Sequence, residues 1–192
     1  LFSTDDRCIV LSEFWRNALV EELGISPDKV TVLYNPCPEV TLNRENSTSI
    51  NIKEKEILYA GTVNHRKGYD DMIKAFARIA YQYPDWKIDI FGHGDLKDAL
   101  NKMIANRKLE NQMEIHNPTD RIYDEYMNSS LYVMSSRYEG LPLVLIEAMS
   151  CGLPCVSFNC PNGPSEIISN GEDGLIVPFG NISELAKSIE WM

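Results

Sequence analysis

The sequence predicts an α/β fold, a doubly wound parallel sheet of the Rossmann-like kind. Short apolar runs alternate with amphipathic helical patterns from residue 56 to the end of the chain. Repeated strand–helix–strand units require right-handed crossovers, so the strands run parallel and helices cover both faces of the sheet. The 192 residues are 44% hydrophobic and 24% charged, a composition typical of a globular protein with a sizeable core.

The first expected elements precede a long polar stretch. A strand at 8–11 runs into a helix at about 13–23, and a further β-rich run follows at 29–34. The next segment, TLNRENSTSINIKEKE, has no apolar period, so it is predicted to be a linker or a long loop. We therefore place a domain boundary between Asn35 and Glu54.

This boundary divides the chain into residues 1–40 and residues 41–192. A strand pattern begins near the first residue and a helical pattern still runs at the last, which indicates part of a longer protein. In the second region, strands are expected at 56–60, 87–91, 113–116, 131–135, 154–158 and 174–178. Helices are expected around Met72 to Tyr83 and then at about 94–106, 120–128, 142–151, 164–169 and 182–191.

Charge and cysteine usage exclude several classes of protein. The net charge of -10 argues against a nucleic-acid partner, because phosphate backbones are bound through pooled Lys and Arg. No apolar run approaches the ~20 residues of a membrane span. The five cysteines are an odd number without paired CxxC spacing, which favours reduced thiols in a cytoplasmic protein. Cys151, Cys155 and Cys160 are close enough in sequence for a metal cluster, but burial as small hydrophobic residues is preferred.

Ligands of a doubly wound sheet bind at the carboxyl ends of its strands, and the loop GTVNHRKG lies at one such end. This loop, residues 61–68, concentrates positive charge in an acidic protein. Gly61 permits close backbone approach, while Arg66 and Lys67 supply charged donors suited to phosphate oxygens. The alternative is an ordinary solvated loop.

A second unusual loop, SSRYEG, follows the expected strand at 131–135. Pro142 fits the first helical position, which leaves the amides of Leu143, Val144 and Leu145 as an anion site. The helix that follows is expected to be apolar all round except for Glu147. A buried carboxylate needs donors, so Glu147 is expected to accept hydrogen bonds from neutral hydroxyls such as a ribose diol. The alternative for Glu147 is a nearby backbone amide.

Glu139 stands just before that helix and is expected to be freer than Glu147. It is expected to reach a polar group beyond the phosphates, with plain solvation as the alternative. The loop FGHGD contains Gly92 and Gly94 but lacks the third glycine of a dinucleotide fingerprint, so close backbone passage near a base or sugar fits better. His93 and His116 are candidate ligands, although one isolated histidine in a loop is more often a satisfied polar residue.

The segment EGLPLVLIEAMSCGLPCVSFNCPNGPSEIISNGEDGLIVP resembles the C-terminal, donor-binding half of retaining glycosyltransferases of family 4. The resemblance is carried by two glutamates separated by seven residues, then A-M-x-x-G-x-P, G-P-x-E-I-I and G-x-x-G-L-x-V. It implies a GT-B fold of two facing Rossmann-like domains and covers residues 55–192. Residues 1–36 are similar to the last strand–helix unit of the N-terminal domain and the hinge, ending in Asn35-Pro36.

The resemblance implies a role for each matching residue. Glu147 would bind the ribose hydroxyls of a sugar nucleotide, and Glu139 would lie toward the donor sugar as the catalytic residue. Lys67 would bind the diphosphate, together with the amides of Gly140, Leu141 and Leu143.

The chain departs from the family pattern in two places. Thr62 follows Gly61 where members often have Gly-Arg, so either Arg66 supplies the missing charge or the diphosphate is held less tightly. Residues 115–117 would face the nucleobase, and Asn117 stands there in place of the usual glycine. No metal ligand is implied.

The resemblance also implies an activity. It is the transfer of a hexose from a nucleotide-sugar donor, in particular a UDP-hexose, with retention of configuration and without a cofactor. The acceptor would be a glycan or glycolipid of polysaccharide or lipopolysaccharide biosynthesis, bound mostly by the N-terminal domain, so residues 1–192 alone are expected to be inactive. The expected location is cytoplasmic, with peripheral association of the full-length protein at the inner face of the membrane. The alternatives are a sugar-nucleotide epimerase-like enzyme and a non-catalytic nucleotide-sugar-binding module.

Overall fold

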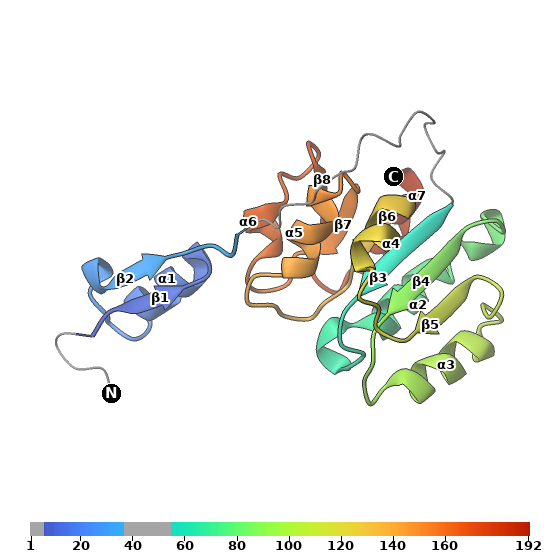
Figure 1. Ribbon diagram of the computed structural model, residues 1–192, viewed down its shortest axis with the longest axis horizontal. Coiled ribbons are helices and arrows are strands. Elements are labelled where there is room, and N and C mark those ends of the chain that lie inside the picture. Colours follow the sequence, from blue (N-terminus) through green and yellow to red (C-terminus); the bar gives the residue numbers. More distant parts are fainter. Residues whose placement is uncertain (1–5, 37–54) are drawn as a thin grey trace.

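The computed structural model describes residues 6–36 and 55–192, which form two sheets. The smaller sheet pairs β1 (Cys8–Val10) with β2 (Val30–Val32) in parallel, and α1 (Glu13–Glu21) and the short 3-10 helix η1 (Pro27–Lys29) connect them (Figure 1). Ser12 caps α1, because its hydroxyl accepts a hydrogen bond from the amide of Trp15. The predicted linker and domain boundary lie almost entirely outside the described residues.

The larger sheet has six parallel strands in the order β5-β4-β3-β6-β7-β8. The strands are β3 (Glu56–Ala60), β4 (Lys87–Phe91), β5 (Met113–His116), β6 (Leu131–Met134), β7 (Cys155–Phe158) and β8 (Gly174–Val177). The chain builds outward from β3 to β5, then crosses over to β6 on the other side of β3. The carboxyl ends of β3 and β6 therefore flank the topological switch point, where open α/β sheets bind ligands.

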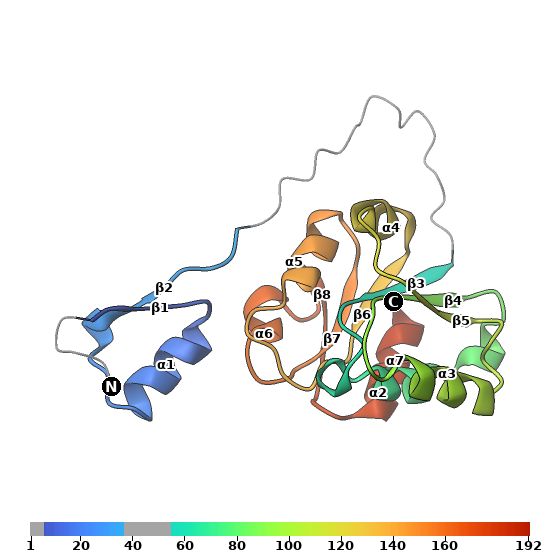
Figure 2. The ribbon, with the colours of Figure 1, turned by 60° about the horizontal axis from the view of Figure 1, so that its bottom comes forward.

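Helices cover both faces of this sheet, which confirms the predicted doubly wound fold. Figure 2 shows α2, α3 and α7 on one side and α4 and α5 on the other. The bounds are α2 (Tyr69–Phe76), α3 (Lys97–Asn106), α4 (Ile122–Asn128), α5 (Leu143–Ser150), α6 (Pro164–Ile167) and α7 (Ile182–Trp191), with 3-10 helices η3 (His65–Lys67) and η4 (Ala80–Gln82). No helix in the described ranges is long and apolar enough to cross a bilayer.

Four tyrosines with neighbouring rings lie in the core, near the carboxyl ends of the strands where ligands are expected. Tyr59, Tyr69, Tyr126 and Tyr132 are all at most 1% exposed. Ring centroids are 4.3 Å apart for Tyr59 and Tyr69, and 5.8 Å apart for Tyr126 and Tyr132. Because a buried hydroxyl needs a partner, such tyrosines can fix polar groups of a site from below.

Several predicted boundaries differ from the structure by a few residues. The helix expected from about 94 begins at Lys97, because the preceding backbone is engaged elsewhere. A Cβ on Gly94 would lie 2.1 Å from the carbonyl oxygen of Val63, and the amide of Leu96 donates to that same oxygen. The segment between Met72 and Tyr83 is also interrupted: α2 ends at Phe76 and only the turn η4 follows.

The expected burial of the cysteines is confirmed for those in the larger sheet. Cys151, Cys155 and Cys160 are buried, and Cys8 is partly exposed. Burial raises the pKa of Cys155 and Cys160 to about 12, so both remain thiols at neutral pH. Among the described residues, no metal-binding group that includes a cysteine is found.

Candidate functional site

The site is built by the two loops that leave β3 and β6 at the switch point. The loop after β3, residues 61–68, ends in η3, whose cap is Asn64: its side chain accepts from the amide of Lys67. Tyr59 donates its hydroxyl hydrogen to the carbonyl oxygen of Lys67 from inside the core. Gly68 follows with φ 65°. The turn that carries the basic residues is therefore fixed at both ends.

The backbones of the two loops touch at Gly68. A Cβ there would lie 2.0 Å from the carbonyl oxygen of Ser135, a distance that no side chain tolerates. The hydroxyl of Ser135 donates to the carbonyl oxygen of Gly68 over 2.8 Å. Glycine is required at position 68 both for its left-handed backbone and for this close approach.

Lys67, Arg66 and Glu139 meet between the loops. The Nζ of Lys67 lies 2.7 Å from one oxygen of Glu139, and the Nη1 of Arg66 lies 3.4 Å from the other. Lys67 and Glu139 are each only 6% exposed. The structure thus brings the predicted phosphate-binding residues and the predicted catalytic residue together. The expectation that Glu139 is freer than Glu147, or simply solvated, is wrong.

The backbone beside this ion pair presents unused donors. Within the described part of the chain, the amides of Gly140, Leu141, Leu143 and Val144 donate to no acceptor. Apart from its two chain neighbours, no atom of the described residues lies within 4 Å of the place where a Cβ of Gly140 would stand, so a ligand can approach this backbone closely.

The predicted anion site is corrected in two details. Pro142 is the N-cap of α5 rather than its first helical residue, with ψ 97°. The amide of Leu145 is not free, because it donates to the carbonyl oxygen of Pro142 over 3.1 Å. The open donors are therefore displaced toward the loop, and they begin directly after Glu139.

Glu147 is held by a tyrosine rather than by a backbone amide. The hydroxyl of Tyr126 donates to its Oε2 over 3.2 Å. Burial, and then the charge of Glu147, raises the pKa of Tyr126, so this phenol remains a donor. An ionised carboxylate accepts about four hydrogen bonds, which leaves Oε1 available to further donors.

The helix α5 is less buried than its sequence predicts. Leu145 and Ala148 are buried, but Leu143 is 44% exposed and Glu147 is partly exposed. One face of α5 is therefore accessible, and Glu147 can contact solvent or a ligand there.

The remaining predicted residues divide into supports and outliers. A Cβ on Gly92 would lie 2.0 Å from the carbonyl oxygen of Gly61, so Gly92 is required by packing between β3 and β4. A Cβ on Gly61 would lie 3.2 Å from the Cε of Lys67, which places this glycine beside the lysine stem. Asn117 accepts from the Nζ of Lys97 over 3.2 Å and has no contact in the described residues with Glu139 or Lys67.

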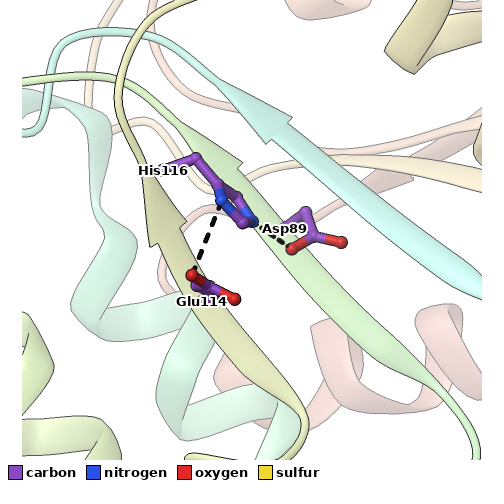
Figure 3. Close-up of side chains that lie close together, drawn as sticks. All are labelled: Asp89, Glu114 and His116. Carbon is purple, nitrogen blue, oxygen red and sulfur yellow. Dashed lines mark hydrogen bonds and ion pairs between the residues drawn. The ribbon is translucent and has the colours of Figure 1, made fainter.

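His116 has carboxylate partners on both ring nitrogens. Figure 3 shows it between Asp89 and Glu114, with 2.5 Å from Nε2 to Asp89 and 3.7 Å from Nδ1 to Glu114. The three side chains offer metal-ligand atoms within 4.8 Å of one another. The short contact with Asp89 already satisfies the imidazole, and the cluster lies on β4 and the edge strand β5 rather than at the switch point.

One residue of the site escaped the sequence patterns. Arg137 contacts both loops, and its guanidinium reaches Asp70 and Asp71 at the start of α2. The available signal in the sequence was the acidic pair Asp70 and Asp71 directly after the basic turn. Arg137 follows these residues by 67 and 66 positions, which local patterns do not connect.

Comparison with known proteins agrees with this fold. The family description "Glycosyl transferases group 1" matches residues 42–192. An exopolysaccharide phosphotransferase of Streptomyces coelicolor is 33% identical over 96% of this chain and 19% of its own length. The amylovoran biosynthesis glycosyltransferase AmsD of Erwinia amylovora is 33% identical over 91% of this chain and 48% of its own length.

Solved structures show the same architecture. HepE of Anabaena, crystallised with UDP, superposes with a TM-score of 0.80 at 21% identity, over 97% of this chain and 53% of that protein. The chain thus spans about half of AmsD and HepE and a smaller part of the phosphotransferase. The family match covers most of the chain and includes every element of the six-stranded sheet. The chain belongs to the group 1 glycosyl transferases, whose structural neighbours have the GT-B fold.

Proposed function

We propose that this chain supplies the donor site of a retaining, metal-independent glycosyltransferase that takes a hexose from a UDP-sugar. The observation that carries the proposal is the arrangement of Lys67 and Arg66 opposite the free amides that follow Glu139. Two cations and several unused amide donors at one switch point suit a diphosphate. The family match and the UDP bound by HepE support the same ligand class.

Each group has a distinct part in the proposed reaction. As the bond between the sugar and the diphosphate breaks, negative charge grows on the leaving diphosphate. Lys67, Arg66 and the amides of Gly140 and Leu141 would stabilise that charge without a metal ion. The free oxygen of Glu147 would accept from the ribose hydroxyls. Glu139 would turn from its cation partners toward the donor sugar.

The acceptor side is proposed from the relatives. AmsD acts in amylovoran biosynthesis, so a glycan or lipid-linked glycan is the proposed acceptor class. The acceptor would be held mainly by parts of the full-length protein beyond residues 1–192, and association with the inner face of the membrane belongs to that full-length protein. On this proposal the isolated chain binds donor but does not transfer sugar.

The phosphotransferase relative favours a second candidate, the transfer of a hexose phosphate. The two reactions release different products from a UDP-sugar. Transfer of the sugar breaks the bond to the anomeric carbon and releases UDP. Transfer of the sugar phosphate forms a bond from the acceptor oxygen to the β-phosphorus, breaks the bond between that phosphorus and the bridging oxygen, and releases UMP.

Two measurements on the full-length protein distinguish transfer of a sugar from transfer of a sugar phosphate. Calorimetric titration with UDP, GDP and ADP, each with and without magnesium, identifies the base and the metal dependence. Incubation with UDP-sugars and glycan acceptors, followed by nucleotide analysis, distinguishes UDP from UMP. Metal-independent binding of UDP with release of UDP supports the proposal. An epimerised donor without transfer, or binding without turnover, would favour the epimerase or the binding module.

A further inference from the structure

We infer that Arg137 is a positioning residue that fixes the distance between the basic turn η3 and the amide donors before α5. The inference rests on the proposed function, because a diphosphate gives that distance its importance. Among the described residues, the guanidinium of Arg137 bonds His65, Asp70 and Asp71 and none of the groups proposed to bind the donor. It acts through the loops that carry the machinery.

The contacts of Arg137 tie both loops together. Its backbone amide donates to the carbonyl oxygen of Arg66 over 2.7 Å, and its Nη1 donates to the carbonyl oxygen of His65 over 2.7 Å. Its Nη2 lies 2.9 Å from oxygens of both Asp70 and Asp71. One residue from the loop after β6 thus binds two carbonyl oxygens of η3 and the start of α2.

The acceptors of Arg137 are themselves fixed in place. The Nζ of Lys74, one turn along α2, lies 2.8 Å from Asp70 and 2.7 Å from Asp71. The side chain of Arg137 is 20% exposed and that of Asp71 is 14% exposed, so water competes weakly for these bonds. A guanidinium can serve a carbonyl and two carboxylates from one plane, whereas an ammonium cannot reach the same set.

This clamp persists when the ion pair of the site exchanges partners. Lys67 and Arg66 bind Glu139 in the structure, and a diphosphate would compete with Glu139 for both cations. Arg137 binds the backbone carbonyl oxygens of residues 65 and 66 and the carboxylates of Asp70 and Asp71. None of these groups is a cation that would exchange partners, so the bonds survive that exchange. Arg137 therefore holds the spacing in the free and in the bound protein, which lowers the cost of ordering the loops on binding.

The test compares full-length variants Arg137→Ala and Arg137→Lys with the parent, and uses Arg121→Ala as the matched control. Arg121 also pairs with an aspartate, Asp124 at 2.7 Å, but both side chains are well exposed, at 76% and 42%. We expect the Arg137 variants to bind UDP at least about tenfold more weakly, with uridine affinity changed less than about twofold. The control should leave both affinities unchanged.

Equal losses for UDP and uridine, or unchanged UDP affinity in a folded Arg137→Lys variant, would overturn the inference. Hydrogen exchange provides a readout that needs no ligand. The hydrogen-bonded amides of Lys67, Gly68, Arg137 and Glu139 should exchange several-fold faster in Arg137→Lys, while those of β4 and β5 should not change. Unchanged exchange in the loops contradicts the inference about Arg137, whether or not the parent binds UDP. Failure of the parent protein to bind UDP would instead overturn the proposed function.

Discussion

At the scale of single residues, the ion pair of Lys67 with Glu139 is the least tolerant feature of the site. Removal of one member of a buried pair typically costs about 3–5 kcal/mol, because the other charge is left uncompensated. We predict this loss for Lys67→Met in urea unfolding, reduced to the extent that Arg66 remains as a partner. The double variant Lys67→Met with Glu139→Gln should be less destabilised than the sum of the single variants. Additive losses would show that the two groups do not interact.

A second residue-scale prediction concerns Glu147. Its replacement by Ala should weaken UDP binding by about 1–3 kcal/mol, because a charged acceptor of the ribose hydroxyls is removed. Tyr126→Phe is the control, since it removes only the internal hydrogen bond to Oε2. Calorimetry of both variants decides the role of the carboxylate: equal affinity in Glu147→Ala and parent would exclude Glu147 from the site.

A third prediction concerns pH and Glu56. Burial, and then the charge of Asp89, raises the pKa of Glu56 to about 6 from its ordinary 4.5. The folded state therefore binds the proton more tightly, and this contribution is present below about pH 4.5 and is lost as pH rises through 6. Because Glu56 is partly exposed, we discount the loss to about 1 kcal/mol. Glu56→Gln should flatten the difference in stability between pH 5 and pH 7; an unchanged difference would contradict the assignment.

At the scale of elements, periodicity predicted which segments form strands, and tertiary contacts decided where helices begin. The strands β3, β4 and β5 have the predicted bounds, since a buried parallel strand is a short apolar run. The start of α3 depends on Val63, which is distant in sequence. Glu147 is likewise bound by Tyr126, and Arg137 by Asp70, across long stretches of sequence. The sequence therefore indicated the carboxylate of Glu147 but not the tyrosine that donates to it.

Gly68 allows an element-scale prediction with a matched control. Gly68 and Gly152 both have left-handed backbones, with φ 65° and 73°. In the part of the chain that the structure describes, a Cβ on Gly152 meets nothing within 4 Å beyond its chain neighbours, so Gly152→Ala should cost about 1–2 kcal/mol from its backbone alone. Gly68→Ala must also move the carbonyl of Ser135 and should cost about 1–3 kcal/mol more. Equal destabilisation in thermal melts would mean that the two loops separate freely.

At the scale of the whole molecule, the described part contains one well-packed unit and one small βαβ unit. Among residues 6–36 the buried side chains are Ser12 and Val30, whereas Ile9 is 69% exposed and Leu33 is 59% exposed. A two-stranded sheet with so little buried surface is marginal on its own. The family match at 42–192 does not reach this unit, and its sequence predicted the elements without indicating what they contact.

Glu166 of α6 connects the two units through hydrogen bonds to α1. Its two oxygens accept from the amides of Glu13 and Phe14, at 2.9 and 3.1 Å, in the first turn of α1. A carboxylate at a helix N-terminus is stabilising, both as an acceptor and through the helix dipole. We predict that Glu166→Ala speeds hydrogen exchange of these two amides about fivefold, which corresponds to about 1 kcal/mol. Glu172→Ala, which replaces an exposed carboxylate without bonds to α1 in the described residues, is the control.

The contact of Glu166 with α1 lies close to the donor loop along the chain. The amide of Glu139 donates to the carbonyl oxygen of Pro161, five residues before Glu166. UDP affinity should nevertheless stay unchanged, since Glu166 touches none of the proposed phosphate-binding groups. A loss of UDP affinity in Glu166→Ala would mean that a shift of α1 changes the geometry of the site. Unchanged exchange of the amides of Glu13 and Phe14 would mean that other contacts hold α1.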